Sequence, residues 1–166
     1  MEPIFFVPLA LGILLVIVLL LVYSYALKGR GEEPRIYPDT DFSDPAGFRV
    51  VSLPGDETLT RGQNLLREGR LAELEFTADP GRPFFLRVCP TGGDLGLDDL
   101  NTAFDQRTVL YLDDTRVVLL QNPGGPALAL WGRGGFDYAL WFEETEMGLI
   151  GGLVDDFVAQ TVTVKS

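Results

Sequence analysis

The residues of this chain that could take part in chemistry are mainly carboxylates. Adjacent acidic pairs occur at Asp98-Asp99, Asp113-Asp114, Glu143-Glu144 and Asp155-Asp156. A glycosidase needs two carboxyl groups that face each other across about 5–9.5 Å. Neighbouring side chains on a strand or helix point apart, so no single pair meets this need. The pairs indicate solvated turns and helix faces, and a hydrolase ranks last among the functions considered.

The sequence offers no clear set of residues for nucleophilic catalysis or for metal binding. The chain contains no histidine, which excludes Ser-His-Asp and Cys-His catalysis and His-based metal sites. Cys89 is the one cysteine, so it forms no intrachain disulfide. A nucleophilic cysteine needs an accessible, electropositive setting, whereas Cys89 follows a strand pattern and is expected to be a half-buried thiol. We predict that the protein is not an enzyme and name no catalytic, cofactor-binding or metal-binding residue.

A glycine-rich loop, residues 92–96, precedes a second group of acids. No Gly-Lys-Ser/Thr follows it, so it does not match a phosphate-binding loop. A divalent cation at Asp94, Asp98 and Asp99 stays open as an alternative, because hard cations take oxygen ligands. The acids do not follow the spacing of an EF-hand, and we expect a turn here.

Three aromatic residues give the one candidate binding surface. Trp131, Tyr138 and Trp141 fall on neighbouring strands and could form a platform for a ligand or partner. Alternating aromatic residues on strands are more often core, although two tryptophans near one hairpin could leave one exposed.

An uncharged stretch near the N-terminus is expected to determine where in the cell the rest of the chain acts. Residues 3–27 carry no charge, and a bilayer core of about 30 Å needs roughly 20 apolar helical residues. The first three residues lack Lys and Arg, and the apolar run is longer than that of a signal peptide, so cleavage near Ser24-Tyr25-Ala26 is the lesser alternative. We predict one transmembrane helix over residues 1–27 and a single-pass protein of the cell membrane.

The charges outside this helix bear on partners and topology. The chain has 13 basic and 24 acidic residues, a net charge of −11, which opposes binding to nucleic acid. Lys28, Arg30 and Arg35 follow the apolar run, and positive flanks favour the cytoplasmic side for the domain. We expect partners to be the membrane itself and a protein located there.

The remaining residues predict one α+β domain after a linker. Prolines and glycines over residues 28–47 indicate the linker, and the domain is expected over residues 48–166. Alternating apolar residues predict strands on both sides of the Asp79-Pro80-Gly81 turn, in a register that sets Arg87 opposite Glu75. Further hairpins are expected at 108–121 and 127–142. The segment 59–70 is ambiguous between helix and strand, and 97–101 reads as one helical turn.

The C-terminal region changes to helical spacing. Met147, Ile150, Val154 and Phe157 recur with this period. Glycines at 148, 151 and 152 weaken such a helix, and we expect close packing against the sheet to compensate for them. The predicted fold is an antiparallel meander of hairpins with this helix packed on one face.

The order of these patterns resembles a known family. The residues that carry the resemblance are Leu74-Glu75-Phe76, 85–89, Gly93-Asp94-Leu95-Gly96, Ala129-Leu130-Trp131 and 134–140. The chain resembles small uncharacterised α+β domains common in Gram-positive bacteria, some attached to transmembrane anti-sigma proteins. The resemblance implies a strand over part of 59–67 and a domain outside the cell, opposite to the flanking charges. It carries over no functional residue, because the family has no established activity.

Two functions follow as hypotheses. The first is a membrane-anchored, non-enzymatic domain that senses, binds or scaffolds a partner. The second is a carrier of an apolar ligand between the sheet and the C-terminal helix, which needs a cavity of about 300 Å³ or more. Packing of Ile150, Val154 and Phe157 onto Phe76, Leu86 and Leu130 would fill that cavity.

Overall fold

The computed structural model describes residues 16–18, 33–55, 57–79, 81–144 and 147–166. The chain divides into two units, Met1–Glu33 and Pro34–Ser166. In the first unit residues 16–18 are helical, and the rest of the predicted transmembrane helix lies outside the described residues. Within the described ranges, no helix has the length and apolar character needed to cross a bilayer. The transmembrane helix therefore stays a prediction.

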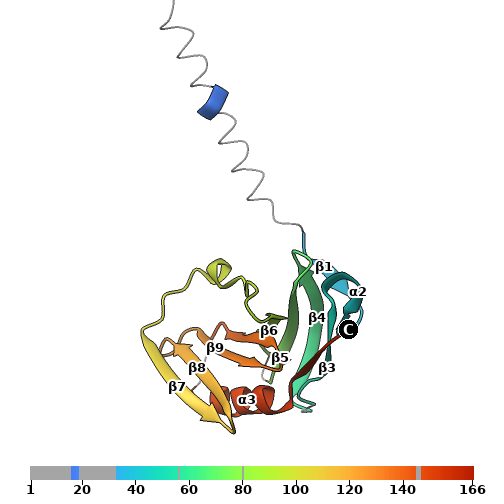
Figure 1. Cartoon of the computed structure of the whole chain (residues 1–166). Coiled ribbons are helices and arrows are strands. Elements are labelled where there is room, and N and C mark those ends of the chain that lie inside the picture. Colours follow the sequence, from blue (N-terminus) through green and yellow to red (C-terminus); the bar gives the residue numbers. More distant parts are fainter. Residues whose placement is uncertain (1–15, 19–32, 56, 80, 145–146) are drawn as a thin grey trace, which may run out of the picture. The chain divides into compact units, whose positions relative to one another are not determined.

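The second unit is built on an eight-stranded antiparallel sheet (Figure 1). Period-two alternation of apolar residues gives each strand two different faces, as the sequence predicts. In spatial order the strands are β1 (Arg35–Tyr37), β4 (Leu59–Arg67), β5 (Leu71–Ala78), β6 (Arg82–Pro90), β10 (Phe136–Phe142), β9 (Ala127–Arg133), β8 (Thr115–Gln121) and β7 (Gln106–Leu112). The strands β1 and β7 thus form the two edges of the sheet, and the predicted hairpins are confirmed.

A smaller sheet and three short helical elements complete the unit. Their bounds are β2 (Asp41–Phe42), β3 (Phe48–Ser52), β11 (Val162–Lys165), α2 (Ser43–Ala46), the 3-10 turn η2 (Leu97–Leu100) and α3 (Met147–Gln160). The order in this sheet is β11-β3-β2. The ring of Phe48 lies 5.4 Å from that of Phe136, which joins the small sheet to the core of the large one.

The helix α3 covers one face of the large sheet, which we call the inner face. Phe157 is fully buried there, with its ring centroid 5.0 Å from Phe76 and 5.6 Å from Phe84, both edge-on. Ile150 and Val154 belong to the same core, whereas Leu130 lies in a separate cluster on the opposite face. The aromatic rings occupy the space in which an apolar ligand would lie between sheet and helix.

The folded unit begins earlier than the sequence predicts. The expected linker 28–47 contains β1, β2 and α2 within its described part, because β1 pairs with β4 and β2 with β3. Its prolines are compatible with structure, since Pro34 and Pro38 flank a three-residue edge strand and Pro45 lies in a single helical turn. The prolines around this edge strand and short helix therefore resemble those of a linker in the sequence.

The register between β5 and β6 also differs from the prediction. Arg87 lies opposite Glu73, and Glu75 lies opposite Phe85. A shift of two residues keeps the same faces apolar, so hydrophobic alternation does not distinguish the two registers. The position of the turn decides, because Ala78 pairs with Arg82, whereas the predicted register would pair Ala78 with Phe84 and centre the turn one residue later.

The glycines of α3 do not compensate by close packing. A Cβ atom added to Gly151 or Gly152 would find no atom within 4 Å, and both residues are exposed. These glycines face away from the sheet, so the expectation of close helix-to-sheet packing at these two positions is wrong.

Candidate interaction surface

The outer face of the large sheet, opposite α3, carries a buried charged cluster. Glu73 and Arg87 are each 3% exposed, and Arg87 Nε donates to Glu73 Oε2 at 2.7 Å. Arg67 of β4 donates to the same carboxylate through Nε at 3.0 Å and Nη2 at 2.7 Å. This hydrogen bonding raises the pKa of Arg67 above its usual range. Both oxygens of Glu73 are therefore engaged by cations, as a buried carboxylate requires.

Arg87 connects this cluster to the segment that follows β6. We call residues 91–105 the crossing segment, because they lead from β6 to the far edge strand β7 (Figure 1). Arg87 Nη1 donates to the carbonyls of Leu95 and Gly96. Gly96 has φ +62°, and a Cβ there would lie 3.1 Å from Arg87 Nη1, so glycine suits the position. One buried arginine thus fixes the path of the crossing segment over the sheet.

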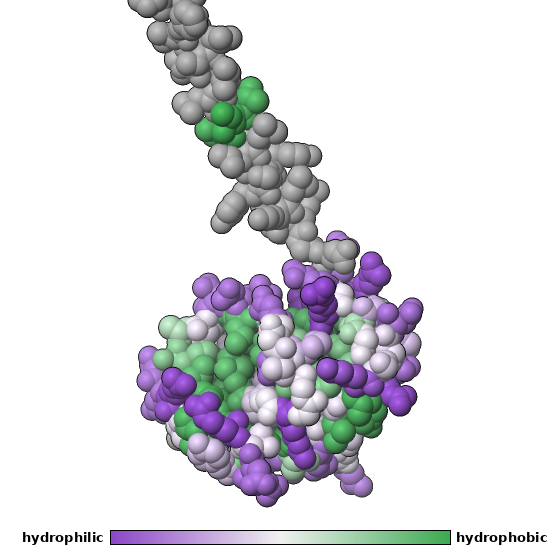
Figure 2. All heavy atoms as spheres, viewed as in Figure 1, coloured by the Kyte–Doolittle hydropathy of each residue, from purple (hydrophilic) through white to green (hydrophobic). Residues whose placement is uncertain are grey.

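The crossing segment covers part of the outer face with apolar side chains. Trp141 contacts Phe104 at 6.0 Å and Phe85 at 6.4 Å between ring centroids. Figure 2 shows apolar side chains gathered where the segment arches over β8 and β9. The residues that form this cluster with Trp141 include Leu95, Leu97, Leu100, Leu120, Leu128 and Leu130. The outer face is therefore a second, smaller core.

Apolar residues continue beyond this cluster to the edge of the sheet. Val109 lies opposite Val118, and Tyr111 lies opposite Arg116. The exposed fractions of Val109 and Tyr111 are 41% and 70%, and Val118 is half-buried. We call Val109, Tyr111 and Val118 the edge patch. Isolated exposed apolar residues are common, but these three adjoin each other on two paired strands.

The patch borders the free edge of β7. In the part of the chain that is described, β7 pairs only with β8. Natural edge strands usually discourage pairing through charges, proline or bulges. The sequence of β7, QRTVLYL, has Arg107 as its one charge and no proline, and its register with β8 runs without a shift. This edge is suited to accept a further strand.

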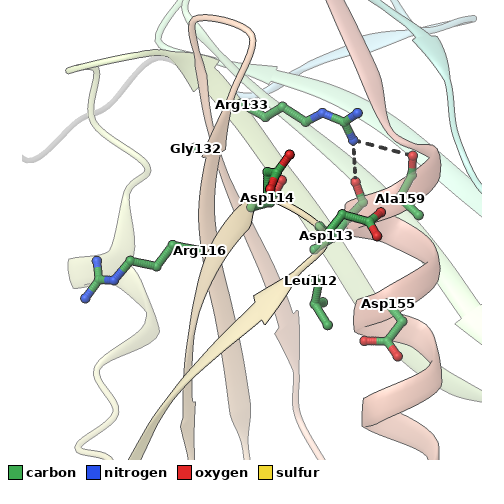
Figure 3. A pocket seen from close by; sticks show the side chains of 10 residues that line it. Leu112, Asp113, Asp114, Arg116, Gly132, Arg133, Asp155 and Ala159 are labelled. Carbon is green, nitrogen blue, oxygen red and sulfur yellow. Dashed lines mark hydrogen bonds between the residues drawn. The ribbon is translucent and has the colours of Figure 1, made fainter.

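A depression lined by three aspartates and two arginines, one of which is Arg116, lies at the hairpin end of β7 and β8. It has a volume of about 880 Å³, and Figure 3 shows Asp113, Asp114 and Asp155 among its lining residues. Arg133 also lines it, and its Nη1 donates to the carbonyls of Val158 at 2.9 Å and Ala159 at 3.5 Å. This guanidinium stabilises the negative end of α3. The depression therefore presents carboxylates beside the edge strand.

The predicted aromatic platform is divided between the two faces. Trp131 and Tyr138 stack at 5.1 Å in the inner-face core, whereas Trp141 lies under the crossing segment. All three are buried, with exposed fractions of 5%, 2% and 6%. Tyr138 and Trp141 are three positions apart on one strand, so they point to opposite faces. The three side chains do not form a common exposed surface.

The other candidate residues have structural partners. Cys89 is buried, and burial raises the pKa of its thiol to about 11, with Asp137 and Asp94 adding to the effect. Asp94 accepts a hydrogen bond from the backbone of Gly96 at 2.7 Å, and Asp137 accepts one from Gly92 at 3.0 Å. Across the described residues, no three acidic or thiol side chains lie together in a way that could hold a metal ion.

Comparison with protein families, with curated proteins and with solved structures finds no match to this chain. The resemblance to domains attached to anti-sigma proteins therefore stays a prediction. The main residues of the exposed surface at β7, Val109 and Tyr111, are not among the predicted site residues. The sequence shows their alternation within a hairpin, but it does not show that this hairpin ends the sheet.

Proposed function

We propose that this protein is a membrane-anchored, non-enzymatic domain that binds another protein through the edge strand β7. The observation that carries the proposal is the free edge of β7 with the exposed edge patch beside it. Addition of a strand to such an edge is a common mode of recognition, in which backbone hydrogen bonds give affinity and alternate side chains give specificity.

The buried polar groups support binding rather than catalysis. Both oxygens of Glu73 accept from arginines, and Arg87 is further held by two carbonyls of the crossing segment. The raised pKa of Cys89 keeps its thiol protonated at neutral pH, when a nucleophile would need to be a thiolate. These groups have structural partners within the fold, whereas the exposed apolar residues at the β7 edge have none among the described residues that would explain their exposure.

The membrane anchor is the second part of the proposal. Its support is the uncharged run of residues 3–27, which is long enough to span a bilayer. The full chain should remain in the membrane fraction after washing at alkaline pH and high salt, and detergent should release it. Release by the wash alone would contradict an integral anchor.

Binding at β7 is tested with a pair of matched valines. Val109 and Val51 are both exposed strand residues, at 41% and 50%, but β3 is paired on both sides. We expect V109E to abolish capture of a crosslinked partner from native membranes, because a charge would be desolvated at the contact. V51E should leave capture unchanged. Equal capture by V109E and the unmodified chain would overturn the proposal.

A further inference from the structure

The crossing segment lies over the outer face without becoming part of the sheet. Residues 91–105 are all described, and they contain no strand and only the 3-10 turn η2 (Figure 1). We propose that this segment is a strap whose middle, residues 94–102, lifts from the sheet while the rest of the fold stays intact. The inference goes beyond the proposed function, and its test needs no binding partner.

Both ends of the crossing segment are fixed to the sheet by hydrogen bonds. At its start, the backbone N–H of Gly92 donates to the carboxylate of Asp137 at 3.0 Å. At its end, the side chain of Asn122 accepts from the N–H of Asp105 at 2.7 Å and donates to the carbonyl of Ala103 at 2.8 Å. These contacts keep the two ends in place when the middle moves.

The middle of the crossing segment is held by a single polar side chain. Among the described residues, the hydrogen bonds that join residues 94–102 to the sheet all come from Arg87, which donates to the carbonyls of Leu95 and Gly96. The other hydrogen bonds of this stretch are internal to it. A strand within the sheet, by contrast, is held by a ladder of backbone hydrogen bonds. The middle is therefore the least firmly attached part of the outer face.

The apolar contacts of the crossing segment are incomplete and separate from the main core. The side chains with which it packs on the sheet are all half-buried: Leu95, Leu97, Leu100 and Phe104. Beneath them, Leu128, Ala139 and Trp141 are buried in a cluster distinct from the inner-face core. Regions that open locally have few buried apolar contacts and few backbone hydrogen bonds to the rest of the fold. Because the two clusters are separate, the smaller one can open while the inner-face core stays packed.

Opening joins the covered surface to the edge patch. Ala139 lies opposite Leu130, Leu130 lies opposite Val118, and Val118 lies opposite Val109. Residues directly opposite each other share a face, so these four side chains form one row on the outer face. The Ala139 end of the row is buried, whereas Val109 is exposed. The crossing segment therefore sets how far the exposed apolar surface extends from β7 across the sheet.

Two buried alanines on neighbouring strands test local opening by thiol labelling. Ala139 belongs to the cluster under the crossing segment and Ala129 to the inner-face core, and their exposed fractions are 1% and 0%. A139C and A129C are each made in the full chain with C89A, and labelling is measured in urea below the unfolding transition. We expect A139C to be labelled at least about ten-fold faster, at a rate that urea barely changes, because local opening exposes little surface. Equal rates with the same dependence on urea would overturn the proposal.

A matched pair of glycines tests what holds the middle in place. Gly96 and Gly134 have nearly the same backbone conformation, with φ +62° and +63°. A Cβ at position 96 would lie 3.1 Å from Arg87 Nη1 and 3.3 Å from Leu71 Cδ2, whereas a Cβ at position 134 would meet nothing within 4 Å. G96A should therefore push the middle from the sheet and raise the labelling rate of A139C several-fold, and G134A should leave that rate unchanged. Equal labelling of A139C with the two changes would contradict a strap held by Arg87.

Discussion

Arg87 is the residue on which the outer face depends most. Its guanidinium meets Glu73 at 2.7 Å and holds two carbonyls of the crossing segment. R87M would leave Glu73 paired with Arg67 but would remove the donor to the two carbonyls, and leaving buried acceptors unsatisfied typically costs about 1–3 kcal/mol. R87M should therefore lower the free energy of unfolding by about this amount in urea titrations.

Arg70 provides the control for this prediction. It is exposed, and substitutions at such positions usually change stability by no more than about 0.5 kcal/mol. R70M should thus have the same free energy of unfolding as the unmodified chain, to within about 0.5 kcal/mol. A loss below about 1 kcal/mol for R87M would show that the buried cluster does not fix the crossing segment.

Cys89 makes stability depend on alkaline pH. Its pKa is raised from 9.0 to about 11 in the folded chain. As pH rises, the unfolded chain loses the thiol proton first, so the stability that this thiol contributes is complete below pH 9 and is lost towards pH 11. The unmodified chain should lose stability relative to C89A across this window. Parallel pH profiles for the two chains would contradict the raised pKa.

Alkylation gives a direct view of the same thiol. Iodoacetamide reacts with the thiolate, so Cys89 should be modified slowly at pH 8 in the folded chain and rapidly after denaturation.

At the scale of single residues, the sequence predicts which side chains share a face of the sheet but not which residues they pair with. The alternation identifies Glu73, Glu75 and Arg87 as one face, while the choice between the two glutamates depends on the position of a turn that the alternation does not fix.

The helix α3 contains two glycines that lower its stability without a packing contact that would compensate. Gly151 and Gly152 are exposed, and an added Cβ would meet nothing within 4 Å. Glycine in a helix interior costs up to about 1 kcal/mol relative to alanine. G151A and G152A should each raise the free energy of unfolding by up to that amount, measured by urea or thermal unfolding. Destabilisation by either change would show that the helix needs a flexible or close-packed backbone there.

Strong periodicity explains which elements the sequence predicts. Strands β5 to β10 and the helix α3 are long enough for apolar spacing or turn signals to identify them, although β5 and β10 are buried on both faces and β7 is largely exposed. The elements that it misses are short: β1 has three residues and β2 has two. Such strands are too short to show a period, and their prolines resemble those of a linker.

At the scale of the folded unit, the strand order places β7 at one edge of the large sheet. The fold class, an antiparallel sheet with a helix on one face, follows from the sequence. The order β1-β4-β5-β6-β10-β9-β8-β7 does not, because local patterns do not say which hairpin ends a sheet. The candidate surface at Val109 and Tyr111 depends on that order, whereas the predicted aromatic residues proved to be interior.

The most direct measurement places a photo-crosslinking amino acid at position 109 of the full chain in its native membrane. The same amino acid at position 51 is the control, since Val51 is at least as exposed as Val109 but lies on β3, which has a neighbouring strand on each side. The account predicts a protein adduct from position 109 and none from position 51. Equal yields from both positions, or no adduct from position 109, would contradict a binding role for the β7 edge.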